Sequence, residues 1–84
     1  MTSLQIAMLN KIARNDFTNV NGDEPKTLND IGWIWASEII VTAQDKGVYT
    51  SLVNANMVEH NGESGLNACI TLTIKGFEAY KASN

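Results

Sequence analysis

The sequence contains few of the residues that hold small domains together through covalent bonds or metal ions. It has one cysteine, Cys69, and one histidine, His60, among 84 residues. A lone cysteine cannot form an internal disulfide, and one cysteine with one histidine cannot complete a structural zinc site. Stability must therefore come from a hydrophobic core, which is small in a chain of this length. We expect residues 1–84 to form a single domain.

Basic residues are also scarce. Six lysines and arginines stand against nine aspartates and glutamates, which gives a net charge of −3 and a pI near 4.8. Binding to duplex DNA draws on the neutralisation of phosphates by clustered cations. A nucleic-acid site in this chain would therefore have to bring together several of its six cations, which are Lys11, Arg14, Lys26, Lys46, Lys75 and Lys81.

No hydrophobic run is long enough to predict a membrane segment. The most apolar stretch, residues 31–41, contains Ser37 and Glu38 and falls well short of the roughly 20 residues that a membrane helix needs. The N-terminal segment carries polar residues among its apolar ones, unlike the uninterrupted core of a signal peptide. We therefore expect a soluble, cytoplasmic protein with no membrane partner.

Motifs for catalysis and metal binding are missing as well. The sequence has no glycine-rich phosphate loop, and His60 stands beside Glu59 without a third residue that would complete a catalytic set. The acidic residues Asp16, Asp23 and Glu24 lack the ligand spacing of an EF-hand calcium loop. We expect no enzymatic activity, no metal and no cofactor.

Helical spacing of apolar residues predicts a helix at the N-terminus. Thr2 or Ser3 can cap this helix, which should run to about Arg14. Its apolar residues recur every four positions at Leu4, Met8 and Ile12, with Leu9 beside them.

Two further helices are predicted after a polar connector over residues 15–26, in which Asn21–Gly22 indicates a turn. Residues 27–30, Thr–Leu–Asn–Asp, are typical of a capping box and predict a helix to about Ile40. Thr42 can cap the next helix, over residues 43–55, whose inward residues are Val48, Leu52 and Ala55.

The predicted helix over residues 27–40 is apolar on two sides. One stripe, formed by Leu28, Ile31, Trp35 and Ile39, can face the core. The second stripe must either pack within the domain or form an interface with a second copy or a partner protein, because tryptophan is enriched at binding hot spots. The sequence leaves both interpretations open for this stripe, which consists of Trp33, Ala36 and Ile40.

A two-stranded wing is predicted after the third helix. Asn56 suits the left-handed conformation that ends many helices, and a strand would begin at Met57 and Val58. Residues 61–67 form a loop with two glycines, and residues 68–74 alternate as a strand, with Ile70, Leu72 and Ile74 on one face. Thr73 can cap a final helix that contains Phe77 and Tyr80.

Two segments, SLVNANMVEH at residues 51–60 and ITLTIKGFEAY at residues 70–80, resemble winged helix-turn-helix regulators of the MarR-like kind. Those proteins place a leucine about five residues before a Gly-Leu-Val junction, as Leu52 stands before residues 56–58. They end the wing in Leu-Thr-x-x-Gly, as residues 72–76 do here. The resemblance implies an α+β winged helix with a three-helix core, a two-stranded β-wing and a short C-terminal helix.

The resemblance also implies a mode of binding. The helix over residues 43–55 would enter the major groove, and the loop over residues 61–67 would touch the DNA backbone or the minor groove, usually from a dimer. The side chains expected to face DNA are Gln44, Lys46, Thr50, Ser51, Asn54 and Lys75.

Two functions follow from these observations. The first is a small transcriptional regulator, of the size carried by phages or mobile elements, that binds duplex DNA as a dimer. The second is an acidic winged-helix module that binds or inhibits a protein partner and does not bind DNA. The low pI, the stripe that contains Trp33 and the acidic wing residues Glu59 and Glu63 favour the second.

Overall fold

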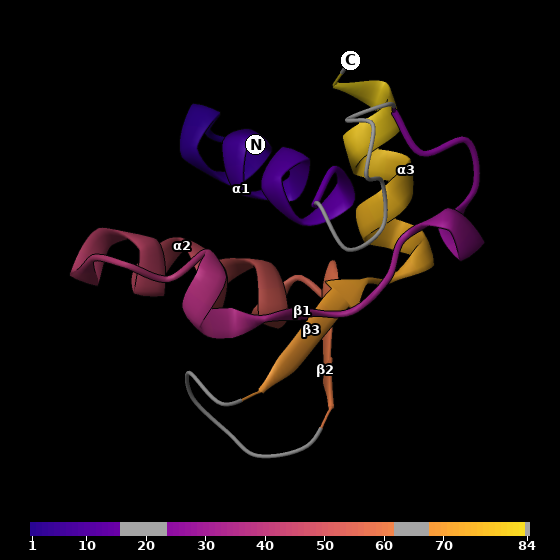
Figure 1. Cartoon of the computed structure of the whole chain (residues 1–84). Helices are drawn as coiled ribbons and strands as arrows, with labels where there is room; N and C mark the ends of the chain where they lie inside the picture. The colour runs from indigo at the N-terminus through magenta and orange to yellow at the C-terminus, as the bar shows by residue number, and fades with distance from the viewer. Residues whose placement is uncertain (16–23, 62–67, 84) are drawn as a thin grey trace.

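The structure is a computed structural model that describes residues 1–15, 24–61 and 68–83. Over these residues the chain folds as an α+β domain with three α-helices and a three-stranded antiparallel sheet, which confirms the predicted winged-helix-like class. Figure 1 shows α1 and α3 together above the sheet and α2 beside it. The elements in chain order are α1 (Ser3–Ala13), β1 (Ile34–Trp35), α2 (Ala43–Asn54), β2 (Val58–Asn61), β3 (Cys69–Leu72) and α3 (Ile74–Ala82).

The first helix begins as its sequence predicts. The Gln5 amide donates to the Thr2 hydroxyl at 3.1 Å, and the Thr2 amide donates to the Gln5 side-chain oxygen at 2.9 Å, so a complete capping box opens α1. Of the apolar residues at this spacing, Leu4 lies outside the buried face, because it is 48% exposed. The buried face of α1 consists of Met8, Leu9, Ile12 and Ala13.

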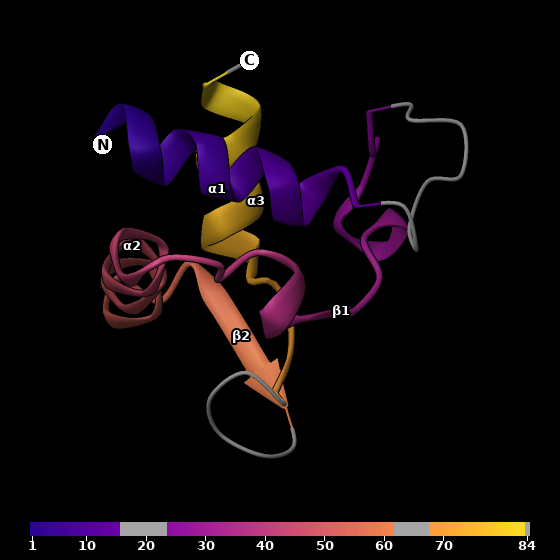
Figure 2. The same cartoon turned by 60° about the vertical axis from the view of Figure 1, so that its left-hand side comes forward.

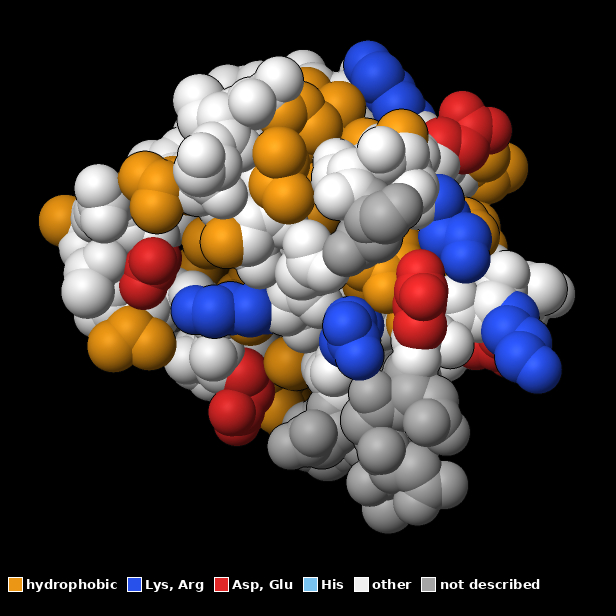
Figure 3. Space-filling view, turned by 90° about the horizontal axis from the view of Figure 1, so that it is seen from above, with side chains coloured by type: hydrophobic (Ala, Val, Ile, Leu, Met, Phe, Trp, Pro, Cys, Tyr) orange, Lys and Arg blue, Asp and Glu red, His pale blue; other side chains and the backbone are white. Residues whose placement is uncertain are grey.

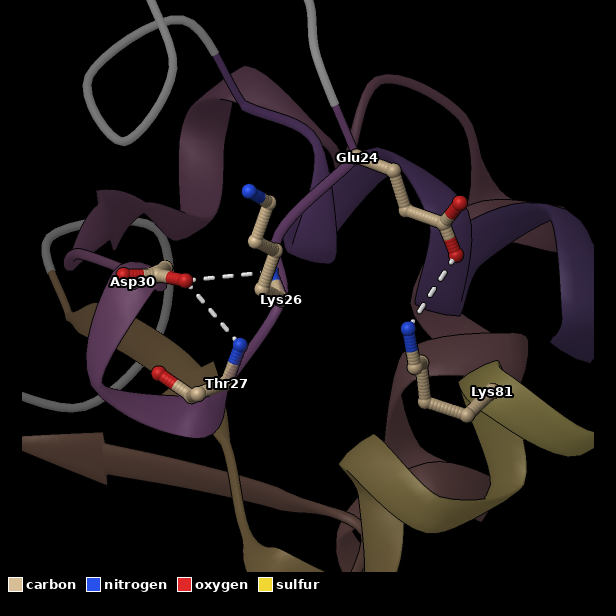
Figure 4. Close-up of polar contacts among 5 residues, drawn as sticks. All are labelled: Glu24, Lys26, Thr27, Asp30 and Lys81. Atoms are coloured by element: carbon tan, nitrogen blue, oxygen red, sulfur yellow. Dashed lines mark hydrogen bonds and ion pairs between the residues drawn. The ribbon is translucent and has the colours of Figure 1, made fainter.

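The predicted helix over residues 27–40 does not form. Its capping box exists, because one Asp30 carboxylate oxygen accepts from the amides of Lys26 and Thr27 at 3.0 Å (Figure 4), but it opens a single 3₁₀ turn, Leu28–Asp30. The next residues are extended and form β1, and a second 3₁₀ turn, Ala36–Glu38, follows. Branched and aromatic residues over 31–35 favour a strand, and Gly32 would weaken a helix by about 1 kcal/mol. The helices of the core are therefore α1, α2 and α3.

Strand β3 lies at the centre of the sheet, in the order β1-β3-β2. Ile34 pairs with Ile70 on one side, and Val58 pairs with Leu72 on the other. All four are buried, so they form the face of the sheet that contacts the helices. The hairpin of β2 and β3 is the predicted wing, and β1 adds a strand that was not predicted.

The core lies between this face of the sheet and the helices. Figure 2 shows α1 crossing in front of α3 above the strands, and α1 contacts α2, α3 and β3. Ile74, expected to face the core from the strand, instead opens α3 and is 68% exposed. The largest fully buried side chains are Tyr80, Leu9, Ile12, Leu52, Ile70 and Leu72.

Two sets of predictions cannot be compared with the structure. The Asn21–Gly22 turn and most of the wing loop lie outside the described residues.

Within residues 1–15, 24–61 and 68–83, no helix has the length and apolar character needed to cross a membrane.

The turn after α2 adopts the predicted left-handed conformation. Asn56 has a φ of 62°, and the Met57 amide donates back to the Leu52 carbonyl at 3.0 Å, as in a Schellman motif. The start of α3 closes against this turn: the Thr73 hydroxyl donates to the Asn56 carbonyl at 2.6 Å, and the Thr73 amide donates to the Met57 carbonyl at 3.1 Å. A Cβ at Gly76 would lie 1.9 Å from the Met57 carbonyl oxygen, so only glycine fits there.

Two glycine substitutions should have opposite effects on stability. Gly76→Ala forces the Met57 backbone to move and should lower the free energy of unfolding by about 1–3 kcal/mol. Gly47→Ala, in the middle of α2, meets no atom within 4 Å and should raise it by about 0.5–1 kcal/mol. Urea unfolding followed by far-ultraviolet circular dichroism measures both. Equal effects of the two substitutions would contradict the close approach of α3 to Met57.

Substitutions at Asn56 test the left-handed turn separately. Asn56→Ala should lower the free energy of unfolding by about 1 kcal/mol, because a Cβ without a compensating polar group is strained at positive φ. Asn56→Gly should leave it within about 0.5 kcal/mol of the parent value, because glycine adopts this conformation freely. The same urea titration decides, and a loss in Asn56→Gly as large as that in Asn56→Ala would rule out conformational strain as the cause.

Candidate nucleic-acid interface

The only acidic residue of α2 is directed at the start of its own helix. The Asp45 carboxylate accepts from the amides of Val41 and Thr42 at 3.1 Å, and the Asp45 amide donates to the Thr42 hydroxyl at 3.1 Å. These backbone N–H groups hold the pKa of Asp45 below its ordinary value. The carboxylate thus stabilises the helix amino end and satisfies donors that would otherwise lack partners.

The opposite side of α2 is exposed and uncharged except at its edge. At about 100° per residue, Ala43, Gly47, Thr50 and Asn54 fall on one stripe, and all four are exposed. Lys46 lies at the edge of this stripe. These five residues are called the α2 outward face. No carboxylate belongs to it, and the absence of a side chain at Gly47 lets another molecule approach the helix backbone closely.

Three of the six residues expected to face DNA come together on this face: Lys46, Thr50 and Asn54. Ser51 does not belong to it, because its hydroxyl accepts from the Gln5 side chain of α1 at 3.0 Å and donates to the Val48 carbonyl at 2.6 Å. Gln44 is exposed on the flank of the helix that Ser51 shares. The bond from Gln5 to Ser51 therefore joins α1 to α2.

Lys75, the sixth residue, lies in the first turn of α3. The Thr73 hydroxyl before it bonds to Asn56 at the carboxyl end of α2, whereas Lys46 is in the first turn of α2. At 1.5 Å per residue, these two ends of the helix are about 15 Å apart. The two lysines therefore lie near opposite ends of α2.

The expected stripe of Trp33, Ala36 and Ile40 does not exist as a surface. It assumed a helix, and the chain is extended at β1. Trp33 is 44% exposed, Ala36 is fully buried, and Ile40 is half-buried. Ile40 instead lines an open cleft of about 460 Å³ beside the start of α2, together with Val41, Thr42, Ala43, Lys46, Tyr49 and Thr50.

Sequence reasoning missed this cleft, although the apolar run before Thr42 was a signal for it. Val41 is 80% exposed at its rim. Partial burial raises the pKa of the Tyr49 hydroxyl above its ordinary value, and this hydroxyl, at the wall of the cleft, can donate a hydrogen bond. The cleft extends the α2 outward face on its Lys46 side with a mainly apolar wall.

Charge on another side of the molecule is mixed. Seen from above α1 and α3 in Figure 3, basic and acidic side chains are interspersed without a patch of one sign. The ion pair between Glu24 and Lys81 at 3.5 Å (Figure 4) joins the segment before β1 to α3, and both side chains are about half exposed. Among the described residues in this view, no cluster of cations suited to a phosphate backbone is visible.

Over the described ranges, no group of three or more His, Cys, Asp or Glu side chains is placed to hold a metal ion.

Comparison of the chain with protein-family models, with curated proteins and with solved structures finds no match. Interpretation of the site therefore rests on its own geometry.

The role of Asp45 has a consequence for the pH dependence of stability. Its ordinary pKa is 3.8 and the folded pKa is lower, so its contribution is fully present above the unfolded value and is lost as the pH falls through the folded value. Asp45→Asn should therefore destabilise the protein near neutral pH, and the difference from the parent should shrink at about pH 2. Urea unfolding across this range measures it, with Glu78→Gln in α3 as the control. A difference that stays constant with pH would contradict a charged cap.

Proposed function

We propose that this chain is a small DNA-binding regulator that places the α2 outward face against duplex DNA. One observation carries the proposal: the face combines Lys46, Thr50 and Asn54 and holds no carboxylate, because Asp45 is bonded to the backbone at the helix start. A net charge of −3 therefore does not describe this surface. The positive end of the helix dipole lies beside Lys46 and adds to its field.

The dimensions of α2 suit the major groove. Twelve residues make a helix about 18 Å long, and the groove is about 12 Å wide. In this docking Asn54 can pair with an adenine edge and Thr50 can bond to either kind of base edge. Gly47 lets the helix backbone approach the DNA, and Lys46 and Lys75 each neutralise a phosphate.

The small number of cations argues for two copies on DNA. Each neutralised phosphate contributes about 0.9 to the slope of log affinity against log salt concentration, so two lysines give a slope of about −2 per chain. Binding this weak is useful only when two domains act on one site, where linked contacts multiply. A dimer on a two-fold site is therefore part of the proposal.

A second candidate is the protein-interaction module, and one observation favours it. Trp33 and Trp35 are 44% and 49% exposed, which leaves two large apolar side chains in water in a small domain. This surface is separate from the α2 outward face, so the two functions do not compete for the same residues.

Titration of a labelled random duplex at two salt concentrations tests the DNA proposal. The parent protein should bind at low salt and lose affinity steeply as salt rises. Lys46→Gln should weaken binding and reduce the magnitude of the salt slope by about 1. Lys81→Gln removes the same charge from the mixed surface, where Lys81 pairs with Glu24, and should leave the slope unchanged.

Two outcomes would overturn the proposal. One is no binding at low ionic strength by a correctly folded protein. The other is an equal loss of affinity in Lys46→Gln and Lys81→Gln, which would mean that net charge alone, and not the α2 outward face, governs association.

A further inference from the structure

The sheet has a second face that no helix covers in the described residues. Side chains alternate along each strand, so the residues between the buried Ile34, Ile70, Leu72 and Val58 point the other way. Trp35 pairs with Cys69, which pairs in turn with Asn61, while Glu59 pairs with Thr71. We call this the outer sheet face. It consists of Trp33, Trp35, Glu59, Asn61, Cys69 and Thr71.

Two indole rings dominate the outer sheet face. Trp33 and Trp35 stand two residues apart on either side of the buried Ile34, so the alternation places both on the same side of the strand. Continued by one residue, the register of β1 and β3 sets Trp33 opposite Thr71. Thr71, on the central strand of this face, is only 8% exposed.

The charge on this face has one sign. Glu59 is exposed on β2, and the face contains no lysine or arginine. The cations of the chain belong to other elements: Lys11 to α1, Arg14 to its carboxyl end, Lys26 to the segment before β1, Lys46 to α2, and Lys75 and Lys81 to α3. The face thus offers aromatic rings and a carboxylate together.

We propose that the outer sheet face is a docking surface for a basic, arginine-containing segment of a partner protein. A guanidinium group stacks on an indole ring through its planar face and is attracted to the negative ring surface. A second basic side chain of the same segment can pair with the carboxylate on β2, across the central strand, through its N–H donors. Trp35 and Trp33 supply the rings, and Glu59 supplies the carboxylate.

Charge complementarity favours a basic segment over duplex DNA and over a second copy of the chain as the occupant of this face. Duplex DNA would bring phosphates to a face that holds Glu59 and no cation. A second copy of the chain, docked by the same face, would bring a second Glu59 and again no cation. Only a cationic partner makes use of both features of the face, and an arginine side chain fits the rings better than a lysine side chain.

Tryptophan fluorescence is a direct probe of the outer sheet face, because the chain contains only two tryptophans and both belong to this face. The probe is a synthetic twelve-residue peptide of alternating arginine and glycine, added to the full chain while tryptophan emission is followed. The expected result is saturable binding that changes the emission, and that is weaker for the lysine–glycine peptide. A glutamate–glycine peptide of the same length should leave the emission unchanged.

Matched variants separate a built surface from general attraction to an acidic protein. Trp35→Leu should weaken binding by about threefold to tenfold, measured by calorimetry, because a stacked cation is lost. Glu59→Gln should weaken it by about twofold to fivefold. Glu78→Gln removes the same charge from α3 and should have no effect, and Lys46→Gln should have none either, because it changes only the α2 outward face.

Several results would overturn the inference. One is an equal loss of peptide affinity in Glu59→Gln and Glu78→Gln. Another is an unchanged affinity for the arginine–glycine peptide in both Trp33→Leu and Trp35→Leu. A third is binding of the glutamate–glycine peptide as tight as that of the arginine–glycine peptide. Sedimentation equilibrium tests the second copy: a dimer that Trp35→Leu dissociates, without peptide binding by the parent, would assign the face to self-association. Because the measurements use peptide and not DNA, failure here leaves the DNA proposal standing, and the reverse also holds.

Discussion

The structure depends on how α2 ends. Asn56 turns the chain through a left-handed conformation, and the carbonyls of Asn56 and Met57 are then bonded by Thr73. Gly76 allows α3 to pack directly on the Met57 backbone. One small cluster of backbone atoms therefore ends α2, begins β2, ends β3 and begins α3. The direction of α2 relative to the sheet, and with it the orientation of the α2 outward face, is determined at this cluster.

Features that depend on neighbouring residues were predictable from the sequence. The caps at Thr2, Thr42 and Thr73, the left-handed Asn56 and the alternation of β3 all arise from chemistry within a few positions of each residue. The segment after Thr27 was predicted wrongly for the same reason. Its capping box is real but stabilises only one turn, and the choice between helix and strand for residues 31–35 was made by pairing with β3, which local pattern cannot reveal.

In the candidate site, too, features set by neighbouring residues were predictable, and features set by contacts between distant residues were not. Of the α2 residues that were expected to face outward, Lys46, Thr50 and Asn54 lie together on one side of the helix. The bond from Gln5 to Ser51 joins residues far apart in the chain, so nothing near Ser51 indicated that its hydroxyl contacts α1. The grouping of Trp33 with Ala36 and Ile40 applied a helical period to an extended segment. A period of two places Trp33 with Trp35 and separates both from Ala36.

The order of strands, β1-β3-β2, also constrains how the molecule can fold. The central strand is the last of the three in the sequence, so residues 34–35 and residues 58–61 both lack a pairing partner until residues 69–72 are in place. Pairing of β2 with β3 is a local hairpin, whereas pairing of β1 with β3 joins Ile34 to Ile70 across a long loop, which is a slow kind of step compared with the formation of α1 or α2. During synthesis, the two tryptophans beside β1 leave the ribosome well before the strand that anchors them.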